Sequence, residues 1–247
     1  MGAQKIIKFV CFLLLVFLAT FSSLIDTQNR LRKAQTDTII VSSDHKGVIV
    51  KSIQSSVMIL STSSFNDEGI TSTSSGTYIS HKGLNYIITS AHSLIGTCST
   101  TVIIADDFIF DCQEFIYVDS HKDVALLQIE EIFNRNPITI SNLLYGENVT
   151  KNNLGVHEKT FYTGYPQAMG PLTFDGKIVS HTTQNDTFLV NSYAWAGSSG
   201  SGVFNTKGNL IGIITAVSVA NTEHGVDVME DLIIVTPISL SDFREIL

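Results

Sequence analysis

The chain has 247 residues, of which 44% are hydrophobic and 15% charged, so it is long enough to bury a sizeable core. Its formal net charge of −8, without a basic stripe, argues against nucleic-acid binding. Ile, Val, Thr and Ser are abundant and there are only 4 Pro, a composition that favours an all-β fold.

The first predicted element is an uncharged apolar run over residues 9–25, preceded by Lys5 and Lys8. At about 17 residues, this run suits either the apolar segment of a signal peptide or a short membrane anchor. Either alternative predicts a domain outside the cytoplasm, secreted or held at the membrane. We expect the chain to divide into a signal peptide or anchor (1–25), a polar linker (26–46) and one folded domain (47–247).

From residue 47 onward, short apolar runs alternate with turn residues, which is typical of half-buried strands. The predicted strands lie within 48–62, 76–91, 99–112, 124–130, 158–165, 176–183, 186–194 and 209–219. The predicted turns are 81–83, 174–176 and 205–208. Only residues 240–247 read as a helix, which Ser241 or Asp242 would cap. Many short strands with frequent turns predict a β-barrel or a β-sandwich.

Two cysteines, Cys98 and Cys112, flank a predicted hairpin that turns near residues 105–107. A hairpin centred there would place the two sulfurs opposite each other, and an exported domain would then carry a disulfide. The alternative is two buried thiols in a reducing compartment. The cysteines have no metal-ligand spacing, so no metal is expected.

Three local patterns carry candidate chemistry. A strand at 87–91 ends in His92, Asp123 opens an apolar strand, and a glycine-rich turn at 196–202 contains Ser199. Alone, each has an ordinary explanation: a solvated histidine, a turn aspartate and a flexible loop. A serine hydroxyl is a weak nucleophile that needs a base, so the three residue types together suit nucleophilic catalysis.

These motifs, in this chain order, resemble those of the trypsin-like serine peptidases. Within that family the chain is most similar to the protease domains of the HtrA type, without a PDZ module. That similarity is carried by residues 207–216, 176–180 and 164–166. The resemblance implies a chymotrypsin-like fold of two six-stranded antiparallel β-barrels with a short C-terminal helix, in addition to the N-terminal hydrophobic helix.

The resemblance also implies the roles of the site residues. His92, Asp123 and Ser199 would form the catalytic triad, with His92 as the base and Asp123 as its orienting partner. The backbone N–H groups of Gly197 and Ser199 would form the oxyanion hole. Ser201 is a second candidate nucleophile because it also has glycine neighbours, but Ser199 fits the register of the family.

Specificity is predicted from the same register. Tyr193 would lie near the base of the S1 pocket, with Thr215, Ala216 and Val217 along its wall. The base has no aspartate, which argues against cleavage after Arg or Lys, and Val217 should narrow the pocket. We therefore expect cleavage after small or medium apolar residues. The predicted partner is a polypeptide substrate, with no cofactor and with membrane contact only through an uncleaved N-terminal segment.

Two alternative functions remain open from the sequence. One is a viral or phage protease that processes its own precursor, which a single-domain chain with a hydrophobic amino end permits. The other is a non-catalytic binding protein on the same fold, a state that usually follows loss of a triad member. The sequence leaves the oligomeric state undetermined.

Overall fold

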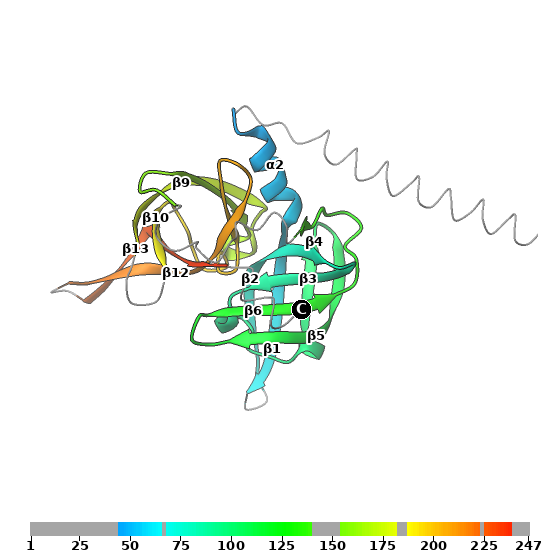
Figure 1. Cartoon of the computed structure of the whole chain (residues 1–247). Coiled ribbons are helices and arrows are strands. Elements are labelled where there is room, and N and C mark those ends of the chain that lie inside the picture. Colours follow the sequence, from blue (N-terminus) through cyan, green and yellow to red (C-terminus); the bar gives the residue numbers. More distant parts are fainter. Residues whose placement is uncertain (1–43, 66–67, 140–153, 182–186, 223–224, 239–247) are drawn as a thin grey trace, which may run out of the picture. The chain divides into compact units, whose positions relative to one another are not determined.

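The structure is a computed structural model that describes residues 44–65, 68–139, 154–181, 187–222 and 225–238 (Figure 1). These residues fold mostly into β-strands, with one α-helix, α2 (Lys46–Ser55), at the start of the described chain. In these ranges, every helix is too short or too polar to cross a bilayer. The predicted N-terminal segment (1–25) and C-terminal helix (240–247) lie outside the described residues.

The first barrel contains six antiparallel strands in the order β1-β4-β5-β6-β3-β2 and closes where β1 pairs with β2. A short seventh strand pairs in parallel with β2. The strands are β1 (Ser56–Phe65), β2 (Glu68–His81), β3 (Leu84–Thr89), β4 (Thr101–Ala105), β5 (Phe108–Asp119), β6 (Val124–Ile129) and β7 (Ile138–Thr139). Inward-facing residues of this barrel form one core cluster, which includes Ile59, Ile87, Ile103 and Leu127.

The second barrel is closed by six antiparallel strands in the order β10-β13-β12-β11-β8-β9. The strands are β8 (Lys159–Gly164), β9 (Leu172–His181), β10 (Phe188–Asn191), β11 (Gly202–Asn205), β12 (Leu210–Thr222) and β13 (Gly225–Pro237). Tyr162, Phe188, Val203 and Ile214 belong to its core cluster. The prediction of two six-stranded antiparallel barrels is therefore confirmed within the described residues.

A third apolar cluster joins the two barrels. It combines Ile88 of β3 with Phe204 of β11 and Ile213 of β12, and Val48 of α2 packs into the same cluster. These side chains are almost fully buried, so the barrels share a continuous apolar contact. This contact lies next to the segments that carry the candidate site, because β3 leads to His92 and β11 follows the glycine-rich turn with Ser199.

The strand predicted over 48–62 is wrong in its first half, because residues Lys46–Ser55 form helix α2 and the strand begins only at Ser56. Val48, Ser52 and Ser55 are the buried residues of the helix, at a spacing that places them on one helical face. Ser52 Oγ donates to Thr163 Oγ1 of β8 at 2.8 Å. Tertiary contacts of this kind override the strand preference of the β-branched residues.

The turn predicted at 174–176 is also wrong, because these residues lie inside strand β9. Gly176 is needed there for close approach: a Cβ at this position would lie 2.6 Å from the Asn191 carbonyl oxygen of the neighbouring strand. The turns predicted at 81–83 and 205–208 are confirmed as the β2–β3 and β11–β12 connections.

Candidate active site

His92 lies in a short 3-10 turn, Ala91–Ser93, directly after strand β3. The turn is closed by a hydrogen bond of 2.6 Å between the hydroxyls of Ser90 and Ser93. Ala91 and Ser93 are buried, whereas the imidazole of His92 is 51% exposed. The local sequence therefore anchors the turn on both sides of His92 and leaves its ring accessible.

Asp123 holds His92 at two points. Its Oδ1 accepts the backbone N–H of His92 at 2.8 Å, and its Oδ2 lies 2.7 Å from Nδ1 of the ring. Because a carboxylate only accepts hydrogen bonds, Nδ1 is the donor, and Nε2 of the neutral ring keeps its lone pair. His92 follows strand β3 and Asp123 precedes strand β6. The antiparallel pairing of Thr89 with Ala125 in these strands brings His92 and Asp123 together.

A tight turn before β6 sets the direction of Asp123, which has a left-handed φ of 56°. The carboxylate of Asp119 stabilises this turn by accepting the backbone N–H groups of His121 and Lys122 at 2.8 and 2.9 Å. Its other oxygen accepts the hydroxyl of Tyr117 at 2.8 Å. These hydrogen bonds hold the pKa of Asp119 below its ordinary value, because they stabilise the ionised carboxylate. The bond from the Lys122 N–H has the largest effect, followed by that from the Tyr117 hydroxyl.

The glycine-rich turn before β11 is fixed through its carbonyl groups. Each of the four carbonyls in residues 196–199 accepts a hydrogen bond. The donors, in chain order, are Gln167 N–H at 2.7 Å, the Ser75 hydroxyl at 2.7 Å, Ser201 N–H at 3.1 Å and Ser75 N–H at 2.8 Å. In a trans peptide the N–H points opposite to the C=O, so the N–H of Gly197 faces away from Gln167 and the N–H of Ser199 faces away from the Ser201 N–H. Among the described residues, neither N–H is bonded to an acceptor.

Two glycines of this turn have left-handed backbones, Gly197 with φ 95° and Gly200 with φ 87°. A Cβ at Gly197 would lie 2.6 Å from the Tyr165 carbonyl oxygen, and a Cβ at Gly200 would clash with the Ser75 carbonyl oxygen. Glycine is therefore required at both positions by backbone conformation and by space.

The two candidate nucleophiles differ in accessibility. Ser199 is partly exposed, whereas Ser201 is completely buried. The Ser201 hydroxyl oxygen is inaccessible to solvent and has no hydrogen-bond partner within the described structure. A substrate can therefore reach the side chain of Ser199 but not that of Ser201 without a rearrangement of the turn.

The four residues predicted to form the S1 pocket lie in two segments of the second barrel. Tyr193 is 59% exposed and stacks on Trp195, with ring centroids 6.1 Å apart. Thr215 is buried and its hydroxyl lies 3.1 Å from that of Thr236. Ala216 is exposed, and Val217 packs against the core of the second barrel. A pocket formed by these residues stays a prediction.

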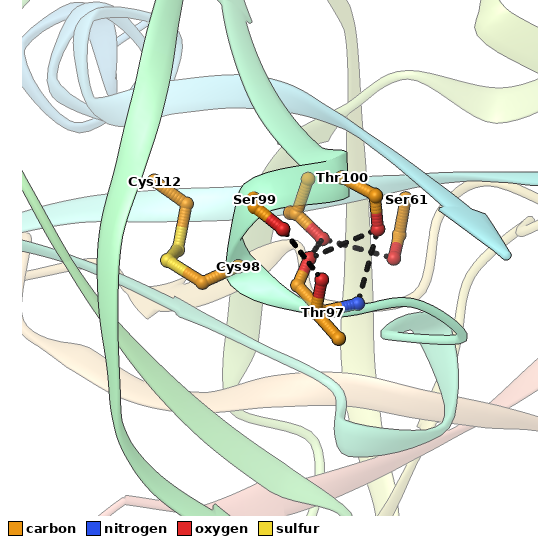
Figure 2. The surroundings of a disulfide bond; sticks show 7 residues. Ser61, Thr97, Cys98, Ser99, Thr100 and Cys112 are labelled. Carbon is orange, nitrogen blue, oxygen red and sulfur yellow. Dashed lines mark hydrogen bonds between the residues drawn. A yellow bond between two sulfur atoms is a disulfide. The ribbon is translucent and has the colours of Figure 1, made fainter.

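Cys98 and Cys112 form a disulfide (Figure 2). Cys98 lies in a 3-10 turn, Cys98–Thr100, that starts five residues after the His92 turn, and Cys112 lies on β5. The hairpin predicted around residues 105–107 is confirmed, with Ala105 paired to Phe108. Of the two alternatives that the sequence left open, the structure contains the bonded pair.

Sequence reasoning missed Ser75 and Gln167, which hold the glycine-rich turn through hydrogen bonds to its carbonyl groups. Ser75 lies 122 residues before Gly197 in the chain, in a strand without any local motif. Gln167 follows residues 164–166, whose likeness to HtrA-type proteins was the only sequence signal near it. Contacts between segments so distant in the chain leave no pattern in a single sequence.

Two antiparallel barrels, with a histidine–aspartate pair on one and a glycine-rich serine turn leading into the other, are the architecture of trypsin-like peptidases. The family profile "Trypsin-like peptidase domain" matches residues 74–213, more than half of the chain. The chain therefore belongs to the trypsin-like peptidase domain family, as its motifs predicted.

Solved structures of similar fold include serine endoproteases and HtrA-type proteases. The serine endoprotease from Yersinia pestis is 20% identical, with a TM-score of 0.59 over 80% of this chain and 64% of that one. The HtrA-type protease AlgW with tripeptide is 18% identical, with a TM-score of 0.59 over 79% of this chain and 60% of that one. The chain thus spans less than two thirds of either structure, and at such identities the likeness shows the fold alone. None of the curated proteins matches the chain.

Proposed function

We propose that this protein is a serine endopeptidase that uses His92, Asp123 and Ser199 as its catalytic triad. The observation that carries the proposal is the two-point bond between Asp123 and His92, which leaves Nε2 of an exposed imidazole as a proton acceptor. Family membership and the partial exposure of Ser199 support the same assignment.

In the proposed reaction, His92 Nε2 takes the proton of Ser199 as its Oγ bonds to the scissile carbonyl carbon. The N–H groups of Gly197 and Ser199 then donate to the oxyanion. When the intermediate collapses, the imidazolium gives its proton to the leaving amine and an acyl-enzyme remains. Water, deprotonated by His92, hydrolyses this ester and restores the serine. Asp123 stabilises the imidazolium throughout.

The proposed substrates are polypeptides, cleaved after small or medium apolar residues. One structural neighbour is described with a tripeptide, which supports a peptide-binding role for this fold. Position 193, proposed as the base of the S1 pocket, is a tyrosine and not an acidic residue, which argues against cleavage after Arg or Lys. The proposed location is outside the cytoplasm, which the Cys98–Cys112 disulfide supports because such bonds persist in oxidising compartments.

The test treats the full-length protein with a fluorophosphonate probe and maps the modified residue by mass spectrometry. We expect labelling of Ser199, loss of labelling in Ser199→Ala and in His92→Ala, and full labelling in Ser201→Ala. Cleavage of a peptide library by the same samples would define the P1 residue. A wild-type protein that is folded but neither labelled nor able to cleave would instead be a binding protein on this fold. Self-cleavage alone would favour a precursor-processing role.

A further inference from the structure

Ser75 of β2 is a fully buried residue that is bonded to both halves of the candidate site. Its carbonyl oxygen accepts the hydroxyl of Thr89, at the end of the strand that leads to His92, at 2.7 Å. Its N–H donates to the carbonyl oxygen of Ser199 at 2.8 Å. The backbone of Ser75 thus connects strand β3, which leads to His92, with the glycine-rich turn that carries Ser199 (here the nucleophile turn).

The hydroxyl of Ser75 makes two further bonds to the second half of the site. It donates to the carbonyl oxygen of Gly197 at 2.7 Å and accepts the backbone N–H of Tyr165 at 2.8 Å. A serine hydroxyl has one hydrogen to donate, and acceptance from Tyr165 orients the rotor so that this hydrogen faces Gly197. The hydroxyl is therefore a fixed donor aimed at one carbonyl.

The bonded carbonyl lies between the two groups proposed to bind the oxyanion. The N–H of Gly197 belongs to the preceding peptide and the N–H of Ser199 to the one that follows Ser198. Gly197 is a glycine with φ 95°, so its own conformation resists rotation of the intervening peptide only weakly. The N–H of this peptide, on Ser198, donates to the Trp195 carbonyl oxygen at 2.9 Å, and the Ser75 hydroxyl restrains its carbonyl end.

We propose that Ser75 is a positioning residue whose hydroxyl holds the N–H groups of Gly197 and Ser199 in the geometry that binds the oxyanion. It touches neither the substrate nor the reacting atoms and acts only through the Gly197 carbonyl. This inference rests on the proposed function of Ser199. Loss of the Ser75 hydroxyl should therefore weaken stabilisation of the transition state and leave substrate binding nearly unchanged, because the buried hydroxyl does not contact the substrate.

The neighbouring Ser74 provides a matched control. It is also buried in β2, but its hydroxyl oxygen has no hydrogen-bond partner within the described residues. Ser75→Ala and Ser74→Ala therefore delete the same atom, from adjacent buried positions, with and without a bond to the nucleophile turn. Ser75→Cys keeps the volume and replaces the hydroxyl by a weak donor, so it carries the test if the alanine variant does not fold.

The experiment measures kcat, KM and the affinity for a peptide boronate in the full-length wild type and in each variant. The tetrahedral boronate adduct is an analogue of the transition state. Removal of one oxyanion donor lowers kcat by about 10²–10³-fold, so loss of a support for the donors should lower it by about 10–10²-fold. We expect this fall in Ser75→Ala, a smaller fall in Ser75→Cys, and boronate affinity that decreases in parallel while KM changes less than about twofold. Ser74→Ala should match the wild type.

Equal kcat values in Ser75→Ala and Ser74→Ala, with an active wild type, would overturn the positioning role and leave the proposed function intact. A fall in kcat with unchanged boronate affinity would also overturn it, because the loss would then lie outside oxyanion binding. A folded wild type that the fluorophosphonate does not label would instead contradict the proposed function itself.

Discussion

Both carboxylate oxygens of Asp123 are bonded to His92, one to the backbone N–H and one to the ring. The aspartate therefore fixes the position of the residue and the orientation of its imidazole together. An aspartate bonded to the ring alone would leave the backbone of the turn free to move relative to the carboxylate.

Asp123→Asn should lower kcat by about 10⁴-fold, with KM little changed. The amide can present an N–H to Nδ1, which would stabilise the wrong tautomer and leave Nε2 protonated. Steady-state kinetics on a peptide ester would measure the loss. Asp111→Asn, at an exposed position on β5, is the control and should keep full activity. A reduction of less than tenfold in Asp123→Asn would show that the ring does not depend on this carboxylate.

Gly200→Ala should destabilise the fold by about 2–5 kcal/mol, because it combines a left-handed backbone with a clash against the Ser75 carbonyl. Gly83→Ala is the matched control, since its φ of 83° is similar but a Cβ there meets nothing within 4 Å. It should cost about 1–2 kcal/mol. Urea denaturation measures both, and equal losses would mean that the turn can move away from β2.

Removal of the disulfide through the double variant Cys98→Ser and Cys112→Ser should lower the free energy of unfolding by about 2–4 kcal/mol. The bond closes a loop with a sequence separation of 14 between the cysteines, so its loss enlarges the unfolded ensemble. Thermal denaturation with and without reductant would measure the effect. Reductant should lower the Tm of the wild type but not of the variant, and a wild type insensitive to reductant would argue against the bond.

Asp119 should make the stability of the protein depend on acid pH. Its folded-state pKa is lowered, so its ionised form contributes stability that is complete above the unfolded value of about 4. This contribution is lost as the pH falls through the lower, folded pKa. Asp119→Asn should therefore flatten the fall in Tm on acidification from about pH 5, and Tyr117→Phe should flatten it in part. An unchanged pH profile in Asp119→Asn would show that the turn does not need the charge.

The sequence predicted those features whose causes are local. The β2–β3 and β4–β5 turns were found because Gly83 and Asp106 are residue types that adopt the positive φ that such turns require. His92 and Asp123 were found because each stands beside an apolar strand within a short motif. Period-2 patterns indicated the strands, and the resemblance of the motifs to those of trypsin-like peptidases implied the two barrels.

The features that were missed depend on distant contacts. In helix α2, Val48, Ile49 and Val50 favour a strand by intrinsic preference, and two of the three buried residues are serines, which hide the helical pattern of burial. Ser75 lacks any local signature because its partners lie in three other segments of the chain. In both cases, contacts with residues distant in the chain determine the structure, and local sequence preference does not predict them.

Helix α2 has a practical consequence for the design of shorter versions of this protein. Lys51 Nζ donates to the Gly208 carbonyl oxygen beside β11, and the Gln54 carbonyl accepts the N–H of Asn136 ahead of β7. The helix is thus hydrogen-bonded to segments of both barrels. A fragment that began at β1 would remove these contacts and expose the apolar cluster into which Val48 packs, so a shortened version should keep the whole of helix α2.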